Sequence, residues 1–467
     1  MSTVSAIGNN RPQRLVLGLG KSGQSVVRYF SEHNIPCVVA DTRAHPPGLE
    51  QIRREFPQLE IVLGPLEQTL LCSVAQIVLS PGISIDHPLL QQALEAGVEV
   101  VGDVELFARQ AKAPVVAITG SNGKSTVTTL VGEMANSAGL KVRVGGNLGT
   151  PALELLKHEE PDLYVLELSS FQLESIQTLE PVAAVVLNIS ADHLDRYRSL
   201  QHYAQVKGQV YLRAVHWVYP AEDEAVVALM ESLAITPQPQ QLSPYYSTTP
   251  VKPGWFGLCK DLSGAVWICQ GEQPLIAVSE LQIFGTHNVT NVVAAMTLAE
   301  AAGVPLAAMV AALQQFSGLP HRTEWVAESR GVRWINDSKG TNVGATEAAI
   351  KGLGRPDHLN KLVLIAGGQG KEADFSPLKV LVKDYVRSVI LMGEDAKLIE
   401  SALGGVTPVY HVATMEEAVV TANRIAEPGD TILLSPACAS FDQFSGFEAR
   451  GDAYKQAVQK RLQKVVR

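Results

Sequence analysis

The sequence predicts an α/β protein of three domains, each built around a mainly parallel β-sheet. Its 467 residues correspond to about three domains of roughly 150 residues each. Short β-branched runs alternate with segments of helical spacing along the chain, which is the pattern of repeated βα units. Most of these runs are continuously apolar, as expected of strands that are buried on both faces of a parallel sheet.

The predicted strands form two series along the chain. The first series comprises residues 14–17, 37–40, 76–79, 98–101, 114–119, 163–168 and 182–188. The second comprises residues 332–335, 362–366, 388–392 and 431–434. Between strands, apolar residues recur at helical spacing; one such stripe, which we assign to the core, consists of Val289, Val292, Val293 and Met296.

Two interruptions of this rhythm predict the domain boundaries. Near Gly102 a strand ends, and a short helix over residues 104–110 leads into the next strand. A joint rich in Gly and Pro occupies residues 316–320. The Pro- and Gln-rich segment 236–257 is expected to form surface loops or a hairpin rather than a hinge between domains. The predicted domains are therefore residues 1–102, 103–316 and 317–467.

Composition excludes several functional classes. Asp and Glu number 47 against 38 for Lys and Arg, and the net charge of -9 removes the generic electrostatic case for nucleic-acid binding. The five cysteines are scattered without CxxC spacing, which fits a reducing cytoplasm. Residues 1–12 are polar and lack the apolar run of a signal peptide, and no stretch approaches the roughly 20 apolar residues of a membrane span. We therefore expect a soluble cytoplasmic protein without a nucleic-acid partner or membrane insertion.

The first chemical motif is Gly18-Leu19-Gly20-Lys21-Ser22-Gly23, which follows a predicted strand and matches GxGxxG. Asp41 ends the next strand, where a dinucleotide-binding fold places its ribose-binding acid. The glycines and helix N–H groups suit any phosphate, so a nicotinamide cofactor, a nucleotide diphosphate and a plain tight turn are all open interpretations. Ser80-Pro81-Gly82 ends another strand and either lines the same crevice or forms a simple turn.

A stronger motif is Thr119-Gly120-Ser121-Asn122-Gly123-Lys124-Ser125-Thr126, between an apolar strand and a helix. Backbone amides would cradle phosphates, Lys124 would neutralise charge between the β- and γ-phosphates, and the Ser125 hydroxyl would reach Mg²⁺. The segment departs from strict GxxxxGK[ST], because Ile118 stands where the first glycine belongs. The alternative is a Gly-rich turn with an exposed lysine.

Further polar residues follow the next strands. Glu167 ends an apolar strand, where an acid can bind Mg²⁺, although pairing with a helix N-terminus explains it too. Residues 188–197 follow the strand after that and contain His193, and Tyr203 and Lys207 lie on a helix beyond them. A lone His is more often structural than a ligand, but this grouping favours a functional role.

Five segments together carry a family resemblance: residues 119–126, 167–172, 192–197, 285–291 and 319–322. They occur in the order seen in the Mur ligases, the ATP-dependent amide-forming enzymes of peptidoglycan precursor synthesis, and the resemblance covers essentially the whole chain. Residues 336–342 and 435–444 resemble the branch of that family that adds D-glutamate. The resemblance implies a Rossmann-like N-terminal domain, a central P-loop ATPase-like parallel-sheet domain and a Rossmann-like C-terminal domain.

The resemblance also implies a reaction. ATP would phosphorylate the alanyl carboxylate of UDP-N-acetylmuramoyl-L-alanine, and the amine of D-glutamate would attack the acyl phosphate and release phosphate. Three anions must then meet, so dense placement of cations is the main catalytic demand. We expect a monomer that closes around its substrates, because the ATP centre and the amino-acid pocket are expected on different domains.

Site residues are carried over by the same resemblance. In this family the GxGxxG domain holds the UDP part of the substrate rather than NAD, which implies contacts from Gly20, Lys21, Ser22, Asp41, Thr42, Arg43, Ser80, Pro81 and Gly82. ATP would be bound by Gly120, Ser121, Asn122, Gly123, Lys124, Ser125, Thr126, Asn288, Asn291, Arg322 and Asp337. A helix cap explains Asn288 equally well. The amino-acid pocket would comprise Thr341, Lys371, Ser440 and Phe447.

Two Mg²⁺ sites follow from the resemblance, with Ser125, Glu167, His193 and Lys207 as ligand positions. Lys207 matches a carbamoylated lysine, and carbamoylation converts an ammonium that cannot bind a cation into an oxygen ligand. Asn147 matches a position that contacts substrate near the transferring phosphoryl group, although a turn Asn is the plain alternative. The expected catalytic set is Lys124, Glu167, His193, Lys207 and Asn147.

Three alternatives stay open at this stage. A nicotinamide oxidoreductase accounts for residues 18–23 but leaves residues 119–126 unexplained. A non-catalytic nucleotide-binding regulator would keep the loops, but it is disfavoured by the intact set of Lys124, Glu167, His193 and Lys207. Another Mur ligase or a folylpolyglutamate synthase would differ in the amino acid that it joins.

Overall fold

The structure is a computed structural model that describes residues 14–193, 195–233, 235, 237–238, 241–250, 252–354 and 360–465. The polar segment 1–12 and part of the segment 236–257 lie outside these described residues. The chain divides into two compact units. The first unit consists of the chain up to Thr119 together with residues 140–184 and 206–216. The second unit consists of residues 120–139, 185–205 and 217–467.

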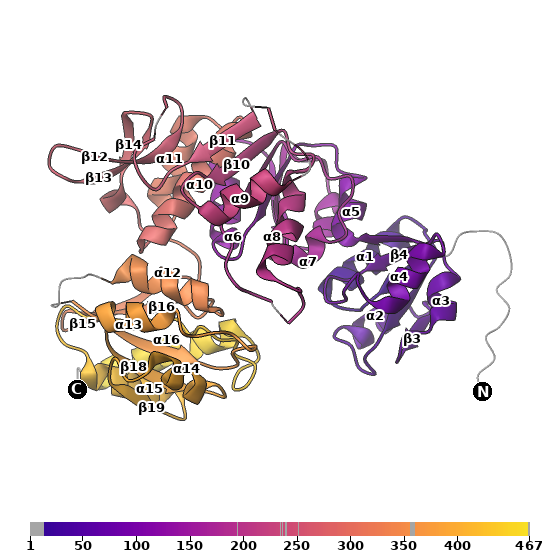
Figure 1. The fold of residues 1–467 in the computed structure, drawn as a ribbon. Helices are drawn as coiled ribbons and strands as arrows, with labels where there is room; N and C mark the ends of the chain where they lie inside the picture. The colour runs from indigo at the N-terminus through magenta and orange to yellow at the C-terminus, as the bar shows by residue number, and fades with distance from the viewer. Residues whose placement is uncertain are drawn as a thin grey trace. The chain divides into compact units, whose positions relative to one another are not determined.

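The N-terminal part, indigo to violet in Figure 1, contains a five-stranded parallel sheet. Its strand order is β3-β2-β1-β4-β5. Its strands are β1 (Arg14–Leu17), β2 (Cys37–Asp41), β3 (Ile61–Leu63), β4 (Gln76–Leu79) and β5 (Glu99–Gly102). Its helices are α1 (Lys21–Glu32), α2 (Leu49–Glu55), α3 (Gln68–Cys72), α4 (Pro88–Glu95) and α5 (Asp103–Ala108). The order reverses between β1 and β4, so the loops after these strands border the crevice in which doubly wound sheets bind ligands.

The middle sheet has nine strands in the order β14-β13-β12-β11-β10-β9-β6-β8-β7. They are β6 (Val115–Thr119), β7 (Val142–Gly146), β8 (Leu163–Glu167), β9 (Ala183–Val186), β10 (His216–Pro220), β11 (Leu242–Tyr245), β12 (Phe256–Lys260), β13 (Val266–Gln270) and β14 (Gln273–Ala277). The associated helices are α6 (Lys124–Ser137), α7 (Ser170–Leu173), α8 (Leu200–Gly208), α9 (Glu224–Ser232), α10 (Thr286–Ala301) and α11 (Leu306–Gln315). The apolar stripe predicted within α10 is buried, so its assignment to the core is confirmed.

The C-terminal part contains a six-stranded sheet in the order β15-β16-β20-β17-β18-β19. Its strands are β15 (Glu324–Ser329), β16 (Val332–Asn336), β17 (Leu362–Gly367), β18 (Val386–Met392), β19 (Val409–His411) and β20 (Thr431–Leu434). Its helices are α12 (Val343–Leu353), α13 (Leu378–Tyr385), α14 (Ala396–Leu403), α15 (Met415–Ile425) and α16 (Phe447–Val465).

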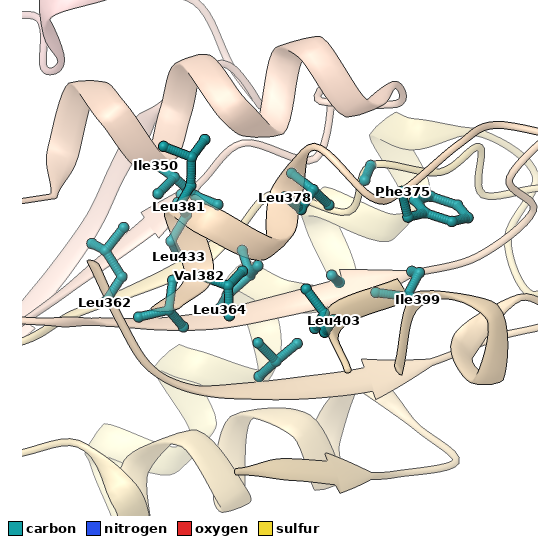
Figure 2. Packing of buried hydrophobic residues seen from close by; sticks show 14 of the residues in the cluster. Ile350, Leu362, Leu364, Phe375, Leu378, Leu381, Val382, Ile399, Leu403 and Leu433 are labelled. Atoms are coloured by element: carbon teal, nitrogen blue, oxygen red, sulfur yellow. The ribbon is translucent and has the colours of Figure 1, made fainter. Parts of the chain in front are cut away.

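The central strand β17 is buried on both of its faces, and this is why its sequence is a continuously apolar run. Leu362 and Leu364 pack with α12, α13 and α14 residues in one buried cluster, which Figure 2 shows from close by. Val363 and Ile365 point to the opposite face and join a second buried cluster with residues of α15 and α16. Each fully buried side chain of this size contributes about 1.5–3 kcal/mol through the hydrophobic effect.

Most predicted strands are confirmed within a residue or two. The predicted strand at 98–101 is β5, and the predicted helix at 104–110 is α5. The expectation of loops or a hairpin over residues 236–257 is wrong in part. Strand β11 lies there and pairs parallel to β10, and the antiparallel hairpin is formed later, by β12 and β13. The helices of the described residues include none that combines the length and the hydropathy of a membrane span.

Candidate active site

In the N-terminal sheet, three predicted segments follow three adjacent strands. Residues 18–23 follow β1, residues 42–43 follow β2, and residues 80–82 follow β4. Gly18 has a φ of 95°, and a Cβ on it would lie 2.8 Å from Ser80 Cβ. The Ser80 hydroxyl donates to the Gly18 carbonyl at 2.8 Å. The structure therefore brings these segments together, and the close approach of the loops after β1 and β4 requires glycine at position 18.

Asp41 holds this loop cluster in place. Its Oδ2 accepts hydrogen bonds from the Leu19 N–H at 2.7 Å and from Arg43 Nη2 at 2.7 Å. Its Oδ1 accepts bonds from the backbone N–H and Nε of Arg43 at 2.9 and 2.8 Å. Burial acts to raise the pKa of Asp41, but the bonds from Arg43 and Leu19 hold that pKa below its ordinary value. A carboxylate can accept about four hydrogen bonds, and all four positions are used here. The Asp41 carboxylate in this arrangement has no acceptor position left for a ribose hydroxyl.

The remaining predicted residues of this cluster line its surface. Lys21, Thr42, Arg43 and Gly82 are exposed, whereas Gly20, Ser22 and Pro81 are half-buried. Gly20 is the residue before α1, and a Cβ on it would meet no atom within 4 Å. Exposed polar groups around a helix N-terminus suit an anionic ligand that arrives from solvent.

The phosphate-loop motif has the predicted placement at the start of a helix. Strand β6 ends at Thr119 and α6 begins at Lys124, so Gly120 to Gly123 form the connecting loop. The Lys124 ammonium donates to the carbonyls of Gly120 and Ser121 at 2.8 and 2.9 Å. Gly123 has a φ of 85°, and a Cβ there would lie 2.4 Å from Asn291 Oδ1. The missing first glycine of the strict motif therefore does not prevent the loop from forming.

The segment after β9 holds the phosphate loop in place through hydrogen bonds. Asn188 Oδ1 accepts from the Asn122 N–H at 2.9 Å, and Asn188 Nδ2 donates to the Asn122 carbonyl at 3.1 Å. The Ser121 hydroxyl accepts from the Ser190 N–H at 2.9 Å and lies 3.2 Å from the Tyr203 hydroxyl. Burial raises the pKa of Tyr203, so this hydroxyl stays neutral. These contacts fix the backbone whose N–H groups would receive phosphate.

Two residues that were predicted to bind ATP lie beside the start of α6. Arg322 Nη2 donates to the Ser125 hydroxyl at 2.8 Å. Asn291 is brought to the loop by α10, and its Nδ2 donates to Asn288 Oδ1 at 3.2 Å. Asn288 donates to the Phe284 carbonyl and lies inside the helix, so the simple helix-cap explanation for it is wrong; the cap position is Gly285.

Asn342 joins this constellation without having been predicted as a site residue. Its side-chain amide exchanges hydrogen bonds of 3.3 and 3.4 Å with that of Asn122. Its Nδ2 also donates to Asp192 Oδ2 at 3.1 Å. The only sequence signal was its position at the end of the 336–342 motif, because the contact joins residues 220 positions apart.

His193 adopts a left-handed backbone conformation, with a φ of 54°. Its Nε2 lies 3.7 Å from Asp192 Oδ2. Burial lowers its pKa, Asp192 and Asp195 oppose that shift, and the positive charges of Lys371 and Lys124 reinforce it. A neutral imidazole is the form that ligates a metal.

Asn147 and Glu167 form the second part of the predicted catalytic set. Asn147 follows β7, Glu167 ends β8, and Asn147 Nδ2 donates to Glu167 Oε1 at 2.6 Å. The Asn147 N–H also donates to the Glu167 carbonyl at 2.8 Å. Among the described residues, the buried Oε2 of Glu167 has no hydrogen-bond partner. A buried, unpartnered carboxylate oxygen fits a cation ligand, since burying it unpaired is costly.

Lys207 is buried in α8 with 1% of its surface exposed. Its Nζ lies 3.4 Å from the hydroxyl of Thr119, the last residue of β6. Tyr203 lies on the same helix, as predicted. A lysine that is this deeply buried is unusual, because most lysines lie on the protein surface.

The described residues contain no ready-made cluster of three or more His, Cys, Asp or Glu side chains. Mg²⁺ commonly takes one or two protein carboxylates together with substrate phosphates and water. Glu167, whose buried Oε2 has no hydrogen-bond partner among the described residues, is a donor of the right chemistry for such an ion.

The predicted amino-acid pocket follows three adjacent strands of the C-terminal sheet. Thr341 follows β16, Ser440 follows β20 and Lys371 follows β17. Ser440 is buried, Thr341 is half-buried and Lys371 is exposed. Phe447 begins α16, and the centroid of its ring lies 4.2 Å from the ammonium nitrogen of Lys339. The sheet thus places Thr341, Ser440 and Lys371 at the carboxyl ends of neighbouring strands.

Asp337 lies beside these residues and is buried. The Ser435 hydroxyl donates to its Oδ2 at 2.8 Å, and the Thr323 N–H donates to its Oδ1 at 3.1 Å. Burial raises its pKa to about 7, and Ser435, Thr323 and Arg322 act in the opposite direction. Its proton occupancy therefore changes near neutral pH.

Comparison with known proteins gives matches along most of the chain. Family models match residues 12–102 (Mur ligase MurD-like, N-terminal domain), 118–299 (Mur ligase middle domain) and 321–438 (Mur ligase, glutamate ligase domain). A protein of Nitrosococcus oceani named UDP-N-acetylmuramoylalanine--D-glutamate ligase is 49% identical over 96% of each chain. A Pseudomonas aeruginosa protein of that name is also 49% identical, over 96% of this chain and 97% of its own.

Solved structures give the same fold at much lower sequence identity. MurC of Thermotoga maritima matches with a TM-score of 0.58 at 17% identity and covers 97% of this chain and 100% of its own. MurF of the same organism, in complex with ADP, matches with a TM-score of 0.58 at 14% identity and covers 97% of this chain and 95% of its own. Since close relatives and family models span the chain from its first sheet to its last, this chain belongs to the Mur ligase family.

Proposed function

We infer that this chain catalyses the ATP-dependent addition of D-glutamate to UDP-N-acetylmuramoyl-L-alanine, a step of peptidoglycan precursor synthesis. The observation that carries this conclusion is the near full-length identity of about half to relatives named for that reaction. A shared fold alone would not suffice, because Mur ligases that match with TM-scores near 0.58 carry other names.

We assign one substrate to each predicted domain. Residues 1–102 would bind the UDP moiety, residues 103–316 ATP, and residues 317–467 the amino acid. The loops after β1, β2 and β4, which the hydrogen bonds of Asp41 and Ser80 hold together, support the first assignment. We propose a monomer as the working unit.

In the first step, the alanyl carboxylate would accept the γ-phosphoryl group of ATP. Lys124 supplies positive charge within the phosphate loop, and the N–H groups that Asn188 and Ser190 hold in place would receive the phosphate oxygens. Arg322 reaches the same helix start through Ser125 and would steady the phosphates. Phosphorylation turns a poor leaving group into a good one.

In the second step, the amine of D-glutamate would attack the acyl carbon, and phosphate would leave. Lys371 would pair with a glutamate carboxylate, and Thr341, Ser440 and Phe447 would complete the pocket. Asn288, Asn291 and Asp337 would hold ATP, while Asn147 would orient Glu167 and contact substrate near the phosphoryl group.

Magnesium would be held by Ser125, Glu167, His193 and Lys207, the last as its carbamate. When bound, Mg²⁺ supplies a Lewis acid that offsets charge on the phosphoryl oxygens. The orphaned Glu167 oxygen, the depressed pKa of His193 and the burial of Lys207 support this set. We place the reaction in the cytoplasm, where the five free cysteines would stay reduced.

The decisive experiment measures phosphate release by the purified chain with UDP-N-acetylmuramoyl-L-alanine, Mg-ATP and a panel of amino acids that includes both glutamate enantiomers. We expect turnover with D-glutamate alone. Release with another amino acid would indicate a different ligase of the family, and no consumption of ATP with the muramoyl substrate and D-glutamate would refute the proposal. NADH absorbance at 340 nm should not change under any of these conditions.

A further inference from the structure

The segment that carries Lys371 has an unfavourable backbone. Gly367 and Gly368 have φ values of 115° and 128°, and Lys371 and Glu372 follow with φ values of 54° and 58°. Two successive non-glycine residues in the left-handed region cost of order 1 kcal/mol each. Such a conformation persists only where neighbouring groups impose it, so the contacts of residues 367–372 decide where the Lys371 ammonium lies.

One side of this segment is held by the loop that carries Ser440. The Gln369 N–H donates to the Ala439 carbonyl at 2.9 Å, and the Ala439 N–H donates to the Gln369 carbonyl at 2.9 Å. This isolated bridge joins the two loops as a short antiparallel pair. It fixes Gln369, but it ends two residues before Lys371.

Asp395 supplies the remaining restraint. Its Oδ2 accepts a hydrogen bond from the Gly370 N–H at 2.6 Å, and its own N–H donates to the Gly368 carbonyl at 3.0 Å. A Cβ on Gly370 would lie 2.7 Å from Phe375 Cζ and 3.1 Å from Asp395 Oδ2, so the backbone is pressed against both residues. Phe375 is buried at the edge of the core cluster beside Leu378, as Figure 2 shows.

The carboxylate of Asp395 serves this loop in place of its own helix. Asp395 occupies the N-cap position of α14, where an aspartate side chain usually accepts a bond from the helix and stabilises it by about 1 kcal/mol. Here the side chain makes no such bond. The loop that contains Asp395 is itself held by Asp442, whose Oδ2 accepts from the Glu394 N–H at 3.0 Å.

We propose that Asp395 is a positioning residue that acts through the Gly370 N–H to hold the left-handed turn at Lys371, and thereby sets where the ammonium meets a carboxylate of the incoming amino acid. This inference rests on the proposed function of Lys371. Asp395 itself would not touch the substrate. Loss of its acceptor would let the turn relax toward an ordinary conformation and move the ammonium away.

The test compares Asp395→Ala, Asp395→Asn and the control Glu394→Ala, which alters an exposed neighbour and leaves the Asp442 bond to the backbone intact. For Asp395→Ala we expect the KM for D-glutamate to rise about tenfold, with the KM values for ATP and the muramoyl substrate unchanged. Asn keeps an oxygen acceptor, so Asp395→Asn should return the KM to within about threefold of the wild-type value.

Three results would overturn the inference: an unchanged KM for D-glutamate in Asp395→Ala, an equal rise in all three KM values, or an Asn variant as impaired as the Ala variant. A general loss of folding would appear as weakened ATP binding, which the wild type and Glu394→Ala calibrate. Failure of the proposed function is distinct, since it would already show as absent turnover of D-glutamate by the unmodified chain.

Discussion

The side-chain amide of Asn147 donates to Glu167 Oε1 at 2.6 Å and leaves Oε2 of the same buried carboxylate without a partner among the described residues. Asn147 thus orients the carboxylate of Glu167, and that carboxylate presents its second oxygen, Oε2. This division fits a carboxylate that binds a cation with one oxygen while the other fixes its rotamer.

We predict that Asn147→Ala lowers kcat and raises the Mg²⁺ concentration needed for half-maximal activity. A hydrogen bond to a charged group is worth about 1.5–3 kcal/mol, so the combined loss should be roughly ten- to a hundredfold. A magnesium titration of phosphate release measures both quantities. Asn136→Ala, which alters an exposed Asn at the far end of α6, is the matched control. An unchanged magnesium dependence in Asn147→Ala would contradict the orienting role.

The phosphate loop gives a second prediction. Lys124→Ala should abolish phosphate release, with a loss of about a hundredfold or more, because the ammonium lies within the loop and offsets the charge of the phosphoryl group. Lys141→Ala removes an exposed lysine from a surface ion pair with Glu159 and should leave turnover unchanged. Near-normal turnover in Lys124→Ala would mean that the loop is misassigned.

How far the sequence predicts this fold depends on burial. Strand β17 reads as an unbroken apolar run because both of its faces are covered, and it was predicted within a residue. Strands β13 and β14 were not predicted. They form an antiparallel pair with several half-exposed positions, and the apolar run Val266–Cys269 within β13 is too short to be told from a buried helix segment by its pattern alone.

The site residues likewise fall into two groups, those that a local sequence pattern predicts and those that only the folded structure brings together. The phosphate loop and Glu167 were predictable because a strand end and a helix start fix them locally. The contacts of Asn188 with Asn122 and of Asn342 with Asn122 join residues 66 and 220 positions apart, and no local pattern encodes such pairs. The four bonds to Asp41 could not be inferred either, since only the fold shows that this strand-end acid is used by its own loop.

The buried lysine gives a third prediction. Lys207→Ala should be inactive and regain part of its activity with millimolar acetate or propionate, because a short carboxylate can occupy the space of a carbamate. Lys207→Arg keeps the positive charge, fills the space and offers no oxygen ligand, so it should be inactive with or without the additive. Phosphate release with a carboxylate titration measures the rescue. Full activity of Lys207→Ala without any additive would refute the metal-ligand role.

His287 gives the last prediction, which concerns stability. Burial lowers its pKa from 6.5 to about 4, and its Nε2 lies 3.1 Å from the Thr323 hydroxyl. Because the unfolded chain binds this proton more readily than the folded one, the contribution of His287 is present above pH 6.5 and is lost as the pH falls toward 4. Each pKa unit is worth about 1.4 kcal/mol. In His287→Gln, chemical denaturation at pH 7.5 and pH 5 should therefore show a smaller fall in the free energy of unfolding than in the wild type. His45→Gln, at an exposed position, should behave as the wild type does. If the free energy of unfolding falls equally between pH 7.5 and pH 5 in all three proteins, the His287 imidazole is protonated as easily in the folded chain as in the unfolded one.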